Sequence, residues 1–249
     1  MGTRRFASNG ESDGKPGLVP SGERLKAIAR LWHEIQQVRS GSRILVALDG
    51  FDGAGKSHLS DEIAAHARAS VGRPLVQVSI DGFHHPRRFR RAAGPGPEGF
   101  YRGSYRYSDF RRCVVEPLGS GEPIMPVIWD VARDESITPD PVVVPPRGVV
   151  LVDGIFLHRP ELRDLWDATV WIEVPFAVSV PRGNARFAGA HDPDPEAPSN
   201  SRYVGGQRLY LQEADPRSHA TWVFDNTDLA QPQLRSRNGR GATSPVTTD

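Results

Sequence analysis

Residues 50–57 carry the most specific chemical signal in the chain. They read Gly-Phe-Asp-Gly-Ala-Gly-Lys-Ser, a full match to G-x-x-x-x-G-K-[ST]. Glycines in such a loop allow backbone N–H groups to close around phosphate oxygens. A lysine reaches the terminal phosphates and a hydroxyl holds Mg²⁺, and Lys56 and Ser57 occupy these positions. The pattern predicts a nucleotide site, against the alternative of an ordinary glycine-rich strand-to-helix turn. We expect these residues to hold the nucleotide: Gly50, Asp52, Gly53, Ala54, Gly55, Lys56, Ser57 and His58.

Three carboxylates, Asp49, Asp81 and Asp153, follow short apolar stretches. The carboxyl ends of strands line the ligand crevice in an open α/β sheet. Asp153 ends the apolar run 149–152 and is a candidate second ligand near Mg²⁺, although an Asp-Gly pair is also a turn signal. The same alternative applies to Asp81, which also precedes a glycine. Asp49 is expected to cap the loop rather than take part in the chemistry.

The segments that must position these residues alternate between strand and helix patterns. Apolar runs predict strands at 44–48, 74–80, 148–152, 169–174 and 221–224, and helical patterns predict helices at 23–38, 56–69, 108–118, 176–187 and 203–214. Pro181 is expected to mark a break or a first turn. Residues 82–107 read as a long loop, and 124–129 with 142–144 as a hairpin or small lid element. The alternation predicts an α/β fold of the P-loop NTPase type, with a mainly parallel sheet flanked by helices.

The composition is typical of a single domain. The chain has 249 residues, and we expect a domain at 21–234 between disordered tails at 1–20 and 235–249. A net charge of +1 gives no case for a nucleic-acid or membrane partner. No apolar run approaches the ~20 residues of a membrane span. The single cysteine, Cys113, excludes an internal disulfide and fits the reducing cytoplasm.

Phosphate loops occur in switches, motors and kinases, and two observations narrow the class. A GTPase needs an Asn-Lys-x-Asp base reader, and the chain has no such segment. Residues 204–208 resemble part of a transporter-ATPase signature, but that signature should precede the acidic strand, and here it follows Asp153. We therefore expect 204–208 to belong to the start of a helix.

Over about residues 41–234 the chain resembles the uridine kinase and phosphoribulokinase family. The segment Ile80-Asp81-Gly82-Phe83-His84 is similar to the family's Asp-x-Phe element. Further similar segments are the hairpin at 127–130 with Arg133, the acidic strand at 150–156, and the terminal strand at 220–228, which contains Asp-Asn-Thr.

The resemblance implies ATP-dependent phosphorylation of a small-molecule hydroxyl. Asp81 matches the family's general base, and a carboxylate can take the hydroxyl proton as the phosphoryl group is transferred. Lys56 would act on the transferred phosphate, and Ser57 with Asp153 would hold Mg²⁺.

The resemblance also implies a lid whose arginines close over the transferred phosphate. Arg182, Arg186 and Arg202 flank the polar segment 188–201, and we assign Arg186 to catalysis. The alternative for each arginine is a solvated surface charge.

The chain departs from the family pattern in ways that bear on the acceptor. Asp153 is shorter than the family's usual Glu, so its metal contact would run through water. Residues 129–133 lack the Tyr-Asp-Phe and following His that contact a pyrimidine nucleoside. Residues 81–112 carry a net charge of +5, which fits either a solvated surface or an acceptor with its own phosphate or carboxylate. The arginines of this segment are Arg87, Arg88, Arg90, Arg91, Arg102, Arg106, Arg111 and Arg112.

A nucleoside acceptor, as in uridine kinase, is the first expectation. Pantothenate-, glycerate- or sugar-phosphate-like acceptors are alternatives within the same fold. A nucleotide-binding regulatory protein without phosphoryl transfer is the alternative from another class. His84 and His85 could touch the substrate, but without cysteine partners they are a poor metal site.

Overall fold

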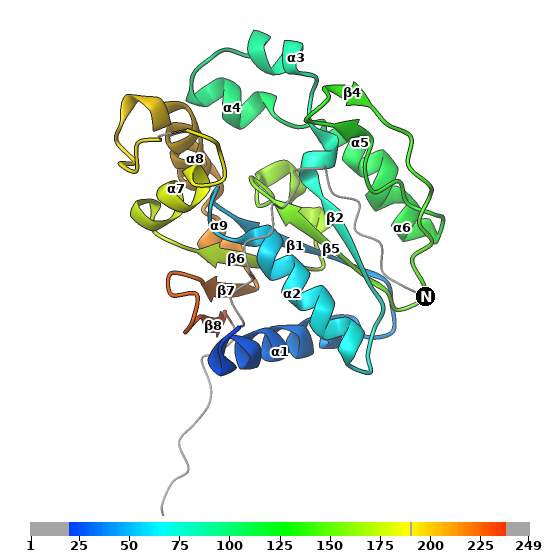
Figure 1. Ribbon diagram of the computed structural model, residues 1–249. Helices are drawn as coiled ribbons and strands as arrows, with labels where there is room; N and C mark the ends of the chain where they lie inside the picture. Colours follow the sequence, from blue (N-terminus) through cyan, green and yellow to red (C-terminus); the bar gives the residue numbers. More distant parts are fainter. Residues whose placement is uncertain (1–19, 190, 238–249) are drawn as a thin grey trace, which may run out of the picture.

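The computed structural model describes residues 20–189 and 191–237 (Figure 1). The expected tails therefore lie outside the described residues, except for residues 20 and 235–237. The α helices are α1 (Gly22–Gln37), α2 (Lys56–Ala69), α3 (Arg87–Ala92), α4 (Pro97–Gly103), α5 (Tyr107–Phe110), α6 (Glu116–Ser120), α7 (Phe176–Asn184), α8 (Ser201–Ala214) and α9 (Pro216–His219). The strands are β1 (Ile44–Gly50), β2 (Leu75–Ser79), β3 (Trp129–Asp130), β4 (Glu135–Ser136), β5 (Val149–Gly154), β6 (Ala168–Glu173), β7 (Trp222–Asp225) and β8 (Gln233–Ser236). Tighter or wider helical segments are η1 (Ile80–Phe83), η2 (Arg111–Val115), η3 (Pro160–Leu165) and η4 (Pro198–Asn200).

A mainly parallel sheet forms the centre of the described chain, in the order β2-β5-β1-β6-β7-β8. The strands pair in parallel as far as β7, and β8 is antiparallel to β7. Every residue of β1 and β5 is buried, as expected for central strands covered on both faces. The α/β fold and mainly parallel sheet predicted from the sequence are confirmed.

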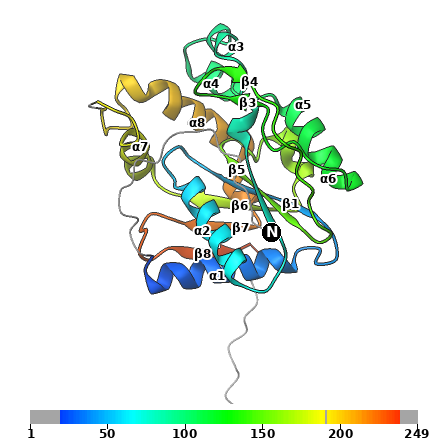
Figure 2. The ribbon, with the colours of Figure 1, turned by 45° about the vertical axis from the view of Figure 1, so that its right-hand side comes forward.

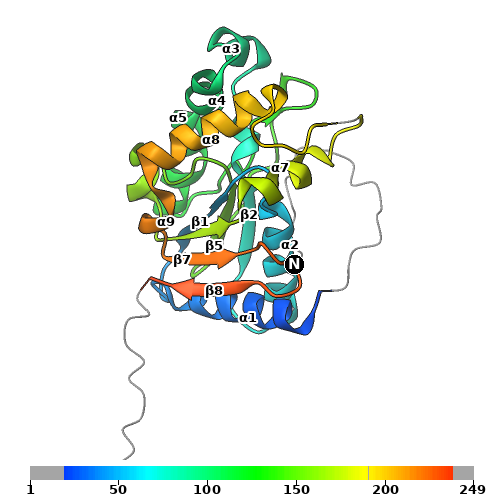
Figure 3. The ribbon, with the colours of Figure 1, turned by 90° about the vertical axis from the view of Figure 1, so that its left-hand side faces the viewer.

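Helices cover both faces of the sheet. Figure 3 looks onto the β8 edge and shows α2 on one side of the sheet and α9 on the other. Helix α1 packs against α2 and β8. Figures 1 and 2 show α3, α4 and the β3–β4 hairpin at the end of the molecule toward which β1, β2 and β5 run. The carboxyl ends of the strands, where ligands bind in this class of fold, therefore lie beneath these elements.

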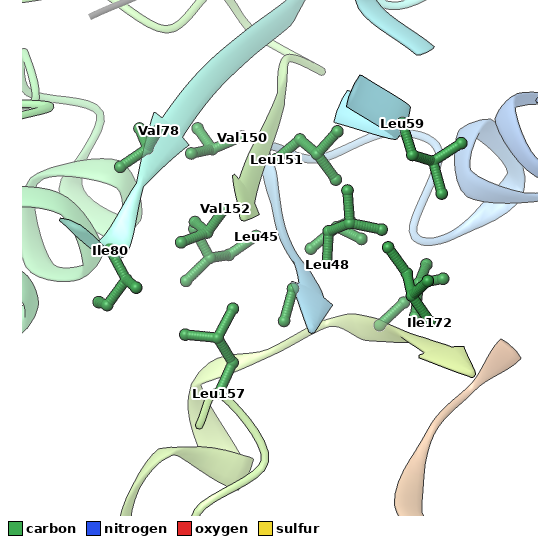
Figure 4. Close-up of a cluster of buried hydrophobic side chains, with 14 of the residues drawn as sticks. Leu45, Leu48, Leu59, Val78, Ile80, Val150, Leu151, Val152, Leu157 and Ile172 are labelled. Atoms are coloured by element: carbon green, nitrogen blue, oxygen red, sulfur yellow. The ribbon is translucent and has the colours of Figure 1, made fainter. Parts of the chain in front are cut away.

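The core is built from branched aliphatic side chains of the central strands and α2 (Figure 4). Leu45 and Leu48 of β1 lie beside Val150 and Val152 of β5, and Leu59 of α2 lies over β1. Each of these side chains is almost fully buried, which is worth roughly 1.5–3 kcal/mol per large aliphatic group. This packing holds rigid the strand ends that carry the acidic residues.

The expected long loop at 82–107 is wrong, because this segment contains η1, α3 and α4. Gly99 explains how a glycine- and proline-rich stretch can be helical. A Cβ at Gly99 would lie 2.4 Å from the Gly94 carbonyl oxygen, so the glycine permits close packing of the α3–α4 turn. Pro97 starts α4, where its missing N–H costs nothing.

Two other local expectations need correction. Pro181 lies inside α7 rather than at a break or in the first turn. A hairpin was predicted between residues 124–129 and 142–144, but these two segments are joined only by a bridge between Ile124 and Val142. The hairpin in the structure is formed by β3 and β4. The helix predicted at 108–118 is present, with a π-helical segment, η2, at its centre.

The last strand, β8, was not expected from the sequence, and it extends to residue 236, past the expected domain boundary at 234. Among residues 20–189 and 191–237, no helix combines the length and apolar character needed to cross a membrane.

Candidate active site

The phosphate loop forms the turn between β1 and α2. Gly53 and Gly55 have φ angles of +74° and +90°, in the left-handed region that favours glycine. A Cβ at Gly53 would lie 1.9 Å from the Ser179 carbonyl oxygen, so α7 packs directly on the loop backbone. Helix α2 starts at Lys56, and its first N–H groups have no acceptor within the helix. These donors and the helix dipole make the loop an anion site.

The ammonium of Lys56 lies against the loop itself. Its Nζ donates to the carbonyl oxygens of Phe51 at 2.7 Å and Gly50 at 3.1 Å, where nucleotide phosphates would compete for it. Desolvation is the largest effect on this group and lowers the pKa of Lys56 below its ordinary 10.5.

Three other expected site residues are close enough to Lys56 for their charges to act on it. The carboxylates of Asp52 and Asp81 oppose the lowering of the Lys56 pKa, whereas the guanidinium of Arg186 adds to it. The structure thus brings together the three residues expected to be catalytic: Lys56, Asp81 and Arg186.

The pair expected to hold Mg²⁺ is also brought together. Ser57 Oγ donates a hydrogen bond to Asp153 Oδ2 at 2.9 Å. Asp153 is buried at the end of β5, where it pairs with Leu48 of β1 and Ser79 of β2. Mg²⁺ prefers oxygen ligands and commonly takes one or two from the protein, with phosphates and water supplying the rest. The hydroxyl and carboxylate fit that donor set, and no cluster of three or more His, Cys, Asp or Glu side chains suited to a metal occurs in the described residues.

Asp81 lies in η1 directly after β2, with its side chain half exposed. Tyr105 Oη donates to Asp81 Oδ1 at 2.9 Å. Burial and the charge of Asp81 raise the pKa of Tyr105 well above 10, so the phenol keeps its proton and remains a donor. The ring of His84 packs on the Tyr105 ring, and its Nδ1 lies 2.9 Å from the Asp81 carbonyl oxygen. Asp81 is therefore a positioned carboxylate with one oxygen held and one face open.

The candidate lid arginines separate into different roles. Arg186 follows α7 and lies beside the phosphate loop, as the surroundings of Gly183 in α7 show. A Cβ placed on Gly183 would be 3.5 Å from the backbone nitrogen of Gly53 in the loop and 3.7 Å from a guanidinium nitrogen of Arg186. Arg182 instead donates to the backbone oxygens of Asn226 at 2.9 Å and of residue 227 at 2.7 Å. Arg202 donates to the carbonyl oxygens of residues 94 and 96 at 2.7 and 3.2 Å. Arg186 is therefore the candidate for the transferred phosphate, whereas Arg182 and Arg202 bond to backbone carbonyl oxygens.

Asp49 does more than cap the loop. It is fully buried, and its Oδ1 accepts from Gly50 N at 2.7 Å. Its Oδ2 accepts from Leu157 N at 3.1 Å and from His158 N and Nδ1 at 3.1 and 2.7 Å. The hydroxyl of Tyr210 also donates to this oxygen. A buried carboxylate needs such donors, and here they connect β1, the segment after β5 and α8 beneath the loop.

Two further residues brace the loop and were not among the site residues expected from the sequence. Gln207 Oε1 of α8 accepts from Asp52 N at 2.8 Å. Asn226, after β7, donates to the Ala54 carbonyl oxygen at 2.7 Å and accepts from buried Arg24 of α1 at 2.9 Å. Asn226 belongs to the Asp-Asn-Thr segment already noted, which was the available signal; Gln207 and Tyr105 had none.

Residues 127–130 resemble the family hairpin that contacts a nucleoside, but the acid of this segment, Asp130, forms hydrogen bonds within its own turn. Asp130 Oδ1 accepts from Ala132 N at 2.9 Å and Arg133 N at 3.1 Å, so it caps its own turn. The guanidinium of Arg106 lies 5.1 Å from the centre of the Trp129 ring, over its face. Trp129 is buried, with Arg106 over one face of its ring, so that face is not open for stacking on a base.

No family model matches the chain. A solved structure described as a possible uridine kinase from Bacillus stearothermophilus aligns with a TM-score of 0.65 at 19% identity, covering 80% of this chain and 98% of that one. A structure described as a candidate fructose transport system kinase from Silicibacter sp. TM1040 aligns with a TM-score of 0.57 at 24% identity, covering 75% of this chain and 95% of that one. At these identities the likeness establishes a shared α/β P-loop fold.

Proposed function

We propose that this protein is an ATP-dependent phosphotransferase that uses Mg²⁺ and transfers the γ-phosphate to a hydroxyl of a small molecule. The observation that carries the proposal is the position of Asp81 at the phosphate loop: it lies two residues after Ser79 of β2, which pairs with Asp153, and Asp153 accepts a hydrogen bond from Ser57 of the loop. A protein that only binds a nucleotide has no need of a half-exposed carboxylate held in place at this position.

Each residue has a defined part in the transfer. The glycine loop and Lys56 bind the triphosphate, and Ser57 with Asp153 would hold Mg²⁺, which supplies charge neutralisation between the phosphates when bound. The oxygen of the acceptor hydroxyl attacks the γ-phosphorus and ADP leaves, while Asp81 accepts the proton of that hydroxyl. Arg186 neutralises negative charge on the phosphoryl group during transfer.

Tyr105 and the core beneath the loop act by positioning. The hydrogen bond from Tyr105 holds one carboxylate oxygen of Asp81 and leaves the other to take the proton of the acceptor hydroxyl. The buried donors around Asp49 hold the carboxyl end of β1 in one geometry. Transfer depends on such alignment, because small displacements of reacting atoms are costly in rate.

A nucleoside is the first acceptor to test, because the fold is shared with a protein described as a possible uridine kinase. The hairpin around Trp129 and Asp130 lacks a free base-contacting surface, which favours including acceptors other than nucleosides. The single cysteine fits a cytoplasmic enzyme.

The deciding experiment measures ADP formation with Mg-ATP and a panel of nucleosides, sugar phosphates and small carboxylated alcohols. An enzyme of the proposed class forms ADP only when a suitable acceptor is added, and the product gains one phosphate by mass. ATP binding without acceptor-dependent turnover across the panel, in wild-type protein with normal nucleotide affinity, would favour the regulatory alternative.

A further inference from the structure

A hollow of about 420 Å³ lies between α3 and the N-terminal end of α8. Its lining residues are Arg87, Arg90, Arg91, Gly94, Pro95 and Arg202. Figure 3 shows α3 above the N-terminal end of α8. The volume falls within the ~300–1,000 Å³ of small-molecule sites, but the lining is cationic rather than apolar.

The four lining arginines have no carboxylate partner within the described chain. None of them forms an ion pair, whereas the neighbouring Arg102 and Arg106 both do. Asp134 Oδ1 accepts the backbone N–H of Arg87 at 2.7 Å, but Asp134 is not part of the lining. Four like charges around one hollow repel one another, and an anion would relieve that repulsion.

Backbone hydrogen bonds hold two of the arginines in place. Arg90 Nε donates to the His85 carbonyl oxygen at 3.0 Å. Arg202 donates through one guanidinium nitrogen to the carbonyl oxygens of Gly94 and Gly96 at 2.7 and 3.2 Å. Both side chains are also partly buried, so burial and these hydrogen bonds together restrict the movement of their guanidinium groups. An anchored guanidinium loses little freedom on binding a phosphate through paired N–H groups.

A short stretch of chain links the hollow to Asp81, the expected general base. His84 contacts Asp81, His85 accepts the hydrogen bond from Arg90, and α3 begins two residues later at Arg87. The hollow is separate from the phosphate loop, because it shares no residue with residues 50–57.

We propose that this hollow, formed by Arg87, Arg90, Arg91 and Arg202, binds a phosphate group other than those of ATP. The phosphate has two chemical sources: it is carried by the acceptor, or it belongs to a separate phosphorylated small molecule that modulates the enzyme. Binding of phosphate is independent of the proposed kinase function, and only its assignment to the acceptor rests on it.

The first experiment measures binding of inorganic phosphate by titration calorimetry, in full-length protein saturated with Mg²⁺ and a non-hydrolysable ATP analogue. Saturation removes the phosphate loop as a competing site. We expect one additional phosphate to bind, acetate at equal concentration to bind more weakly, and added salt to reduce the affinity.

The variants Arg87→Gln and Arg91→Gln test the residues, because both side chains are exposed and their removal breaks no side-chain hydrogen bond or ion pair of the described structure. Each is expected to weaken phosphate binding by about tenfold, the loss of one charge-assisted contact. Arg88→Gln is the matched control: it removes the same charge from the same helix, at an exposed residue outside the lining. Thermal unfolding of each variant verifies that the fold is kept.

Kinetics then separate the two sources. If the acceptor carries the phosphate, phosphorylated alcohols are substrates, and Arg91→Gln raises their KM while the KM for ATP is unchanged. If the phosphate belongs to a modulator, inorganic phosphate changes the turnover of an unphosphorylated acceptor in wild type but not in Arg91→Gln. Both results support the site. Absence of phosphate binding in the saturated wild type, or equal loss in Arg88→Gln and Arg91→Gln, overturns it. Failure of the whole acceptor panel with phosphate binding intact would reject the kinase function and leave the site standing.

Discussion

Tyr105 and Asp81 are joined by a 2.9 Å hydrogen bond, although they lie 24 residues apart and only Asp81 follows a strand. The tyrosine is buried and its elevated pKa keeps it protonated, so it is a permanent donor to the carboxylate. The expected general base therefore depends on a residue outside any recognisable motif.

Tyr105→Phe should lower kcat by about tenfold, in line with the loss of one hydrogen bond to a charged group. The KM for ATP should stay near wild type, because the ring remains and the phosphate loop is untouched. Steady-state kinetics on the best acceptor measure both constants. Tyr107→Phe is the control, since its ring lies beside that of Tyr105 but its hydroxyl does not bond to Asp81, and its loss should not slow turnover. Equal effects of the two substitutions would contradict a positioning role for Tyr105.

Asp81→Asn should lower kcat by about 10²–10⁴-fold, the usual range for removal of a general base. The side chain is similar in size and still accepts the hydrogen bond from Tyr105, so the fold and ATP affinity should persist. Single-turnover kinetics with saturating ATP isolate the chemical step. A variant that keeps kcat, or that loses ATP affinity instead, would remove Asp81 from this role.

ATP binding should take up protons at alkaline pH because of Lys56. Desolvation lowers its pKa in the free protein, so the ammonium begins to lose its proton below the ordinary value of 10.5. ATP phosphates favour the charged form, so binding restores the proton, and affinity falls as pH rises through this range.

Calorimetry in two buffers of different ionisation enthalpy measures this uptake. Lys56→Met should abolish it and weaken ATP binding strongly. Lys26→Met is the control, because Lys26 is exposed and its pKa is raised by Glu23 rather than lowered. Proton uptake that survives in Lys56→Met would assign it to another group.

Gly53→Ala should destabilise the protein by more than 1 kcal/mol (~1 kcal/mol from the backbone angle alone) and abolish nucleotide binding. Its φ of +74° strains any side chain, and the new Cβ would meet the Ser179 carbonyl oxygen at 1.9 Å. Thermal unfolding and ATP titration measure the two effects. Gly119→Ala provides the comparison, because a Cβ there meets nothing within 4 Å. A stable, ATP-binding Gly53→Ala protein would show that α7 does not press on the loop.

The segment between α7 and α8 should become slower in hydrogen exchange when nucleotide and acceptor are both bound. Asn200 Nδ2 donates to the carbonyl oxygens of Asp192 and Asp194 at 2.9 and 2.7 Å, and Asn184 Nδ2 also donates to Asp192 O. These bonds tie residues 192–200 into one unit that could close over the site and exclude water. Hydrogen exchange is measured in the free protein, with nucleotide alone, with acceptor alone and with both. Strong protection of this segment in the free protein would count against a lid.

The sequence is informative where a structural requirement is local. The apolar runs before Asp49 and Asp153 predicted β1 and β5, because a strand buried on both faces tolerates only such residues. The glycine loop was equally clear, since positive φ angles at Gly53 and Gly55 restrict residue type.

Residues that act across long separations gave no comparable signal. Tyr105 reaches Asp81 through a backbone bridge to His84, and Gln207 reaches the loop from α8, and the types of both residues are ordinary for loops and helices. The short helix α4 was missed because glycine and proline lower helix propensity, while tertiary packing around Gly99 overrides it. Helix α3 has only six residues, too few for an apolar periodicity to show in the sequence. The edge strand β8 was missed because its polar side chains alternate over only four residues.

The hydrogen bond from Asn226 to Ala54 has a consequence for the order of events during synthesis. The phosphate loop leaves the ribosome early, but the amide that braces it follows 172 residues later. Until β7 has been made and docked, Ala54 lacks this partner and Arg24 lacks its own contact with Asn226. Nascent chains stalled before Asn226 should therefore retain much less ATP than chains stalled after it. Nucleotide binding would then begin when β7 docks, late in synthesis, and not when the phosphate loop first leaves the ribosome.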